Sequence, residues 1–242
     1  MSHVLLLTLA LGTAGAEPPA PIRCLLVTGG HGFERQPFEA LWNALPGITW
    51  REVQHPHFWP ELKPEAAKAY DVLVLYDLPL TIPDEAKADF VNLLNAGKGL
   101  LALHHCLAGY PQWDEYERII GGRYLLSKRT VAGVEQPAST YHEGVDLPLH
   151  ICDPQHPVTK DLGDFVIHDE VYGHFVVGPD VTPLLGCANP ESDPINGWTK
   201  RYGASQVVYL QPGHGPGAWT DPHWRQIVSN AIAWVKAQSG PK

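Results

Sequence analysis

Short, continuous apolar runs alternate with amphipathic stretches along the first half of the chain, and this alternation constrains the fold more than any other feature. Apolar runs bounded by turn residues are typical of strands covered on both faces, and here they lie at 22–28, 48–53, 71–76 and 100–103. Helical spacing of apolar residues predicts helices at 37–45 and 83–96. Strands that alternate with helices in this way build a parallel α/β sheet.

The second half of the chain has a different character. Its short β-like runs are separated by proline and glycine and lie at 147–152, 165–168 and 182–185. A buried strand is predicted at 206–210, and an amphipathic helix at 221–237 closes the chain. The 23 glycines and 23 prolines are too many for a helical bundle. We therefore predict one flavodoxin-like α/β domain over 22–237, with a loop-rich β insertion in a parallel sheet.

The N-terminus carries a pattern of its own. Residues 4–11 (VLLLTLAL) are too short to span a bilayer, and the small-residue sequence AGA follows at 14–16. This predicts a secretory signal peptide over 1–16, with export to the periplasm or the cell exterior. Because residues 1–5 contain no Lys or Arg, a buried first strand or a misassigned start, with a cytoplasmic location, stays open. No other stretch is long and apolar enough to cross a membrane.

Charge and cysteine content narrow the classes of partner. The chain has 17 Lys and Arg against 26 Asp and Glu, a net charge of −9, which argues against nucleic acid or an anionic membrane surface as the main partner. The four cysteines are widely spaced and form no CxxC pair, so we interpret them as structural. Cys24 in particular lies in an apolar run, where a buried free thiol is expected. The oligomeric state is left open, a homo-oligomer included.

Histidines follow three of the predicted strands at the point where each strand ends. His31 follows the first strand, His104 and His105 follow the fourth, and His214 follows the late strand at 206–210. Because the carboxyl ends of parallel strands meet at one edge of the sheet, these turns are expected to converge on a ligand pocket. His104 stands where a strand turns at once into a helix, which predicts a strained elbow that presents its side chain. Any one of these histidines alone would be a satisfied loop residue.

Acidic residues near histidines form a second group in the later half. Asp169, Glu170 and Tyr172 follow a short strand, and His142 stands in a weaker version of the same pattern, Tyr-His-Glu. Such groups ligate a divalent ion or act as a general base, whereas the alternative is a solvated turn.

A metal site is one hypothesis for these residues, with His104, His214 and Glu170 as the candidate ligands. Imidazole and carboxylate together suit Zn, Mn, Fe or Ni. No HxH or HExxH spacing fixes a ligand set, so histidines that only donate and accept hydrogen bonds remain the alternative.

Several of these stretches resemble a known family. The run Gly-Leu-Leu-Ala-Leu-His at 99–104 resembles the strand ending in histidine of the ThuA-like (trehalose utilisation) family. Further stretches follow in the family's order, at 156–160, 169–172, 198–203, 213–214 and 219–234. The resemblance covers about residues 23–235.

The resemblance implies a fold similar to the class I glutamine amidotransferases and a role in the use of trehalose and related disaccharides. Family members are linked to 3-keto-sugars as isomerases or related enzymes, lyases or hydrolases among them. Amidotransferase chemistry is not implied, because His104 stands where that activity needs cysteine, and Gly215 and Pro216 follow His214 where it needs a His-x-Glu pair. The chain also departs from its own family at His105-Cys106, where small residues are usual.

The preferred function is an enzyme that abstracts a proton next to the carbonyl of a keto-sugar, with His104 or Glu170 as the base. His31, His214 or a divalent metal would stabilise the enediolate oxygen. The residues expected to contact the sugar, in a pocket walled by Trp and Tyr, are Asp169, Tyr172, His105, Trp219 and His142. The alternative is a non-catalytic carbohydrate-binding or scaffold domain.

Overall fold

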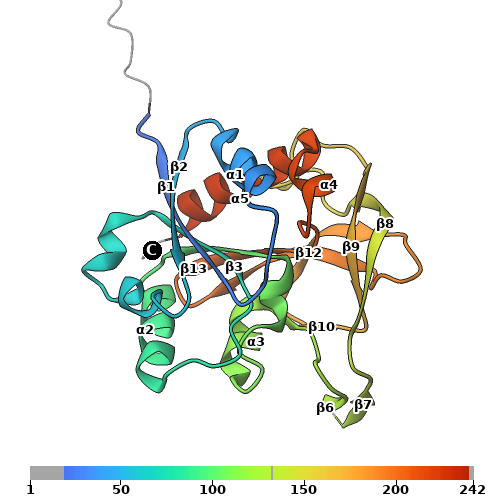
Figure 1. Ribbon diagram of the computed structural model, residues 1–242, viewed down its shortest axis with the longest axis horizontal. Helices are drawn as coiled ribbons and strands as arrows, with labels where there is room; N and C mark the ends of the chain where they lie inside the picture. The colour runs from blue at the N-terminus through green and yellow to red at the C-terminus, as the bar shows by residue number, and fades with distance from the viewer. Residues whose placement is uncertain (1–18, 132, 240–242) are drawn as a thin grey trace, which may run out of the picture.

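The computed structural model describes residues 19–131 and 133–239 (Figure 1). The signal peptide predicted for 1–16 lies outside this part of the chain. The described residues form one nine-stranded sheet covered by helices on both faces, together with two small two-stranded ribbons.

One half of the sheet is parallel and carries the strands predicted from the apolar runs. In spatial order it consists of β2 (Ile48–Gln54), β1 (Ile22–Gly29), β3 (Val72–Asp77), β4 (Gly99–Leu103) and β13 (Ser205–Leu210). The other half is antiparallel and continues with β12 (Ile195–Tyr202), β11 (Thr182–Cys187), β8 (Thr140–Ile151) and β9 (Phe165–Gly173). The α/β class predicted from the sequence is confirmed, and the sheet is mixed around a parallel core.

Helices cover both faces because successive side chains of a strand point to opposite faces. Val72 and Val74 pack toward α1 (Arg35–Asn43), α4 (Pro216–Trp219) and α5 (Pro222–Gln238), which lie on one side of the sheet (Figure 1). Leu73 and Leu75 pack on the other side, which is covered by α2 (Asp84–Asn95), α3 (Asp114–Ile120) and the 3₁₀ turns η1 (Trp59–Leu62) and η2 (Ala66–Ala69). No helix within 19–131 and 133–239 is long and apolar enough to cross a bilayer.

The later half is more regular than the sequence indicates. Its strands extend the main sheet, and β8 alone has 12 residues. Pro148 lies within β8, and the register of β8 against β9 shifts at Gly144, which has φ +64°. A bulge of this kind breaks the apolar alternation, so the runs read from the sequence are shorter than the strands. Loops remain around the short elements β5 (Gly122–Arg123), β10 (Val176–Val177), β6 (Arg129–Val131) and β7 (Val134–Gln136), the last two forming a projecting hairpin (Figure 1).

The cysteines are free, and only Cys152 is exposed. Burial raises the pKa of Cys24 to about 12 and that of Cys106 well above its usual value, so both stay protonated and unreactive. We expect dithionitrobenzoate at mildly alkaline pH to label Cys152 alone in the folded protein. All four thiols should react after denaturation. Two or more fast-reacting thiols in the native state would contradict the placement of the other three.

Candidate active site at the carboxyl edge of the sheet

The site begins at the end of β4. His104 is the first residue of η3 (His104–Ala108) and has a φ of +49°, a left-handed conformation that a side-chain-bearing residue rarely adopts. The chain thus turns sharply at His104, as the predicted elbow requires. The helix that follows differs from expectation: it is a five-residue 3₁₀ turn, and the next α-helix begins only at Asp114.

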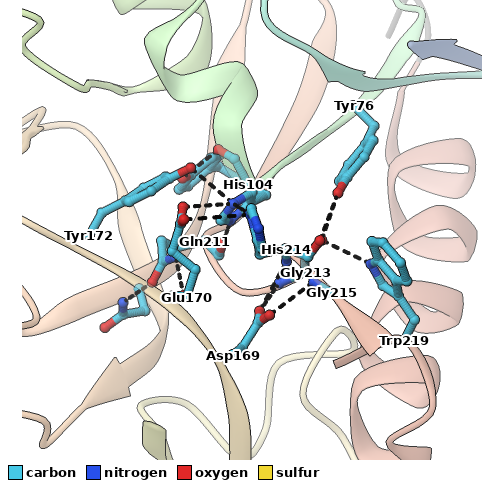
Figure 2. Close-up of polar contacts among 12 residues, drawn as sticks. Tyr76, His104, Asp169, Glu170, Tyr172, Gln211, Gly213, His214, Gly215 and Trp219 are labelled. Carbon is cyan, nitrogen blue, oxygen red and sulfur yellow. Dashed lines mark hydrogen bonds and ion pairs between the residues drawn. The ribbon is translucent and has the colours of Figure 1, made fainter. Parts of the chain in front are cut away.

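His104 meets two other functional side chains there, which come from distant parts of the sequence (Figure 2). Its Nε2 lies 3.2 Å from Oε1 of Glu170 on β9, and 3.1 Å from Nδ1 of His214, which follows β13. His214 Nδ1 also lies 3.6 Å from Glu170 Oε2. One donor atom from each residue falls within 4.8 Å of the others. The structure therefore brings together the three residues that the sequence suggested as metal ligands.

The tautomer of His104 follows from its surroundings. Its Nδ1 lies 2.7 Å from the backbone oxygen of Gln211, which only accepts, so Nδ1 carries the hydrogen. The lone pair of Nε2 is then free to face the cluster, where the Tyr172 hydroxyl donates to it over 2.9 Å. Gln211 is itself held, because its amide donates to the Glu170 carbonyl and accepts from Asn196. A histidine that binds a metal or acts in acid–base catalysis usually donates one ring N–H to a carbonyl and keeps the lone pair of the other nitrogen free.

Glu170 is the acidic member of the cluster. Burial would raise the pKa of its carboxyl, but the polar contacts with His104, His214 and the Tyr172 hydroxyl outweigh burial, and the pKa is lowered. Glu170 is therefore ionised at neutral pH and able to accept a proton or bind a cation.

A cavity of about 290 Å³ opens beside this cluster. Its walls combine two histidines, three tyrosines and two glutamates with three apolar residues: His31, His105, Tyr124, Tyr141, Tyr172, Glu143, Glu170, Leu78, Ala108 and Leu126. His104 lies behind this wall and is fully buried. A hollow of about 350 Å³ beside α2 contains no histidine. This is the convergence predicted for His31, His104, His105 and His214.

Asp169 has a different role from the one expected. Its carboxylate accepts hydrogen bonds from the backbone N–H groups of Gly213, His214 and Gly215, at 2.6, 3.0 and 3.0 Å (Figure 2). Asp169 and Glu170 are neighbours on a strand, so their side chains point to opposite sides, and only Glu170 reaches the cavity. Asp169 therefore positions His214 rather than contacting a ligand.

We expect Asp169→Asn to loosen the loop that carries His214. The amide offers one acceptor oxygen where the carboxylate offers two. The hydrogen bonds donated by the backbone N–H groups of 213–215 also lose the negative charge of their acceptor, which weakens them. The measurement is amide hydrogen exchange of 213–215, with faster exchange predicted while the amides of β3 stay protected. Unchanged exchange in this loop would contradict the positioning role.

Trp219 and His142, both expected in the pocket, lie outside it. Trp219 is buried on α4, and its indole N–H donates to the Gly213 carbonyl over 2.9 Å. His142 pairs with Glu191 over 3.1 Å on the partly exposed face of β8. The two residues flanking His142 line the cavity instead, since neighbouring strand residues alternate in direction.

The family follows from a comparison with known protein families. The family model described as ThuA, trehalose utilisation, matches residues 25–235. The chain belongs to the trehalose utilisation (ThuA) family. No curated protein sequence matches the chain.

Solved structures agree on the fold. A ThuA-like protein from Parabacteroides merdae has a TM-score of 0.74 and 16% identity, with 92% of each chain covered. A ThuA-like protein from Bacteroides uniformis has a TM-score of 0.68 and 19% identity, covering 93% of this chain and 95% of the other. A GMP synthase component from Thermoplasma acidophilum has a TM-score of 0.50 and 14% identity, over 89% and 94%. The expected amidotransferase-like fold is thus confirmed. At sequence identities this low, the similarity concerns the fold and not the activity.

Cys106 does not lie where a nucleophile would meet a ligand in the cavity. Its thiol is fully buried on the α2 and α3 side of the sheet and does not line the cavity. Burial raises its pKa well above the usual value, which removes the thiolate that a nucleophile needs.

Proposed function

We propose that this member of the ThuA family is an enzyme that acts on a keto-sugar by moving a proton next to the carbonyl group. The observation that carries the proposal is the cluster of His104, Glu170 and His214 at the wall of a cavity rich in aromatic side chains. General acid–base catalysis uses imidazole and carboxylate groups that contact one another and whose orientations are fixed by other residues.

Glu170 is the base in this proposal. The sequence left His104 and Glu170 as alternatives, and Glu170 lines the cavity whereas His104 is buried behind it. The Glu170 carboxylate takes the proton from the carbon beside the carbonyl. The electron pair of that C–H bond forms a C=C bond, and the π pair of the carbonyl moves onto its oxygen, which gives an enediolate. A proton then passes from the neighbouring hydroxyl to the former carbonyl oxygen, and Glu170 returns its proton to the former carbonyl carbon. The product is the isomeric keto-sugar, with atoms and charge balanced and no further reactant needed.

The same three residues fit a divalent cation. His104 offers Nε2, His214 offers Nδ1 and Glu170 offers either carboxylate oxygen. Such an ion would polarise the carbonyl and stabilise the enediolate oxygen. Because a carboxylate has two oxygens, ligation by one leaves the other to accept a proton.

The aromatic wall suits a sugar. Tyr124, Tyr141 and Tyr172 line the cavity, and aromatic faces stack on the apolar face of a pyranose ring. Glu143 and the histidines offer partners for hydroxyl groups. A volume of about 290 Å³ lies at the small end of ligand pockets and suits a single ring.

Incubation of the purified protein with 3-keto-glucose and 3-keto-trehalose, followed by NMR, tests the proposal. Samples with added divalent metal and with EDTA are run in parallel with elemental analysis. We expect a new keto-sugar product, and about one equivalent of metal that His104→Ala loses. Binding of the sugar without turnover would overturn the proposal that the protein is an enzyme, and would favour a carbohydrate-binding domain. Less than about a tenth of an equivalent of metal, with turnover surviving EDTA, would leave the histidines as acid–base groups only.

A further inference from the structure

His105 is a polar side chain of the cavity that takes no part in the proposed proton transfer. Both ring nitrogens are buried, and neither finds a hydrogen-bond partner among residues 19–131 and 133–239. The side chain is 3% exposed, although it lines the cavity. The Tyr76 backbone carbonyl lies near the His105 ring and slightly favours the protonated form of that ring. It does not form a hydrogen bond with either ring nitrogen. Buried polar groups without partners are rare and costly, so this one calls for a partner that enters from outside.

The ring of His31 packs against that of His105, and both residues line the cavity. The two ring centroids are 4.6 Å apart with an angle of 30° between the planes, while the Tyr76 ring packs 4.4 Å from His105. Tyr76 is buried in the core, whereas His31 is exposed. His31 is therefore the exposed side of this enclosure, and Tyr76 is its buried side.

The chain around His31 is built with one fixed end and one open end. Gly30 is packed so tightly that a Cβ there would lie 2.2 Å from the Leu78 carbonyl oxygen, and its φ is +83°. A Cβ on Gly32 would meet no heavy atom within 4 Å. His31 thus stands between a closely packed glycine and a glycine with open space beside it, and glycine is the residue with the greatest backbone freedom.

We propose that His31 is a movable cover over His105, and that a sugar entering the cavity displaces His31 and hydrogen-bonds to the uncovered ring of His105. The identity of the ligand rests on the function proposed above, whereas the covering relation does not. His105 acts here as a specificity residue: its neutral ring has one donor and one acceptor, which matches a sugar oxygen and hydroxyl.

Carbethoxylation of histidines by diethylpyrocarbonate, mapped by mass spectrometry on the full chain, tests the cover without any sugar. In the unaltered protein we expect fast modification of His31 and slow modification of His105. His31→Ala should raise the rate at His105 at least about tenfold, as for a group moved from a closed to an open state. His31→Phe keeps a ring in place and should leave His105 slow. Equal rates at His105 in the unaltered protein and in His31→Ala would overturn the cover.

The ligand contact is tested in the same variant. Addition of 3-keto-glucose to His31→Ala should slow modification of His105 at least about threefold if the sugar takes the place of His31. Turnover of this sugar with no protection of His105 would overturn the contact while the proposed reaction stands. An uncovered His105 in a protein that turns over no sugar would overturn the proposed function and the sugar contact, and would leave the cover standing. Thermal unfolding of each variant confirms that it is folded.

Discussion

Replacement of Glu170 by glutamine is expected to lower turnover of the keto-sugar by about 10³-fold, within the range that a positioned general base contributes. The amide keeps the shape of the side chain but accepts no proton at neutral pH. Glu170 also loses the charge that faces His104 Nε2 at 3.2 Å, so a bound cation would be weakened in the same variant. The measurement is the initial rate by NMR, together with metal content and thermal unfolding.

The matched control is Glu135→Gln, which removes a carboxylate that is 69% exposed on the projecting β6–β7 hairpin. Its rate should stay within about twofold of the unaltered protein, because surface substitutions away from a site have small effects. A Glu170→Gln protein that is folded and retains more than about a tenth of the activity would rule out Glu170 as the base.

Gly217→Ala should damage both stability and activity. A Cβ at Gly217 would lie 1.9 Å from the carbonyl oxygen of His168, so α4 must move away from β9. Overpacking of this kind costs about 1–3 kcal/mol, or roughly 3–10 °C in melting temperature for a chain of this size. Because His214 precedes α4 and Glu170 lies on β9, the shift also separates two members of the cluster. A displacement of about 1 Å costs about 10²-fold in rate.

Gly163→Ala serves as the comparison for this substitution. An added Cβ there meets no heavy atom within 4 Å, so the melting temperature should change little or rise slightly. Scanning calorimetry and the initial rate are measured on both variants. Equal melting temperatures for Gly217→Ala and Gly163→Ala would show that α4 does not pack against β9 as closely as described.

The parallel core was predictable because its strands are covered on both faces and therefore appear as unbroken apolar runs. The strand 195–202 was not predicted, since buried Thr199 and Lys200 interrupt its apolar character. Lys200 is buried there because its ammonium donates to the Arg118 carbonyl and pairs with Asp180, contacts that come from distant parts of the sequence. Such long-range pairing leaves no local pattern.

The candidate site divides in the same way. The convergence of His31, His104 and His214 follows from the rule that parallel strands present their carboxyl ends at one edge. The different roles of Asp169 and Glu170 could not be read from the sequence, because they depend on which side of β9 faces the cavity. Gln211, which fixes the tautomer of His104, has no motif of its own, and its part is visible only once β13 is placed beside β4.

The central claim is that this site removes a proton next to the carbonyl of a keto-sugar, and exchange of that proton with solvent tests it most directly. The protein is incubated with 3-keto-glucose in D₂O, with and without added divalent metal, and the C2 proton is followed by NMR. We predict protein-dependent loss of the C2 signal, absent in Glu170→Gln and unaffected in Glu135→Gln. Exchange no faster than in the protein-free sample, under either metal condition, would contradict the account.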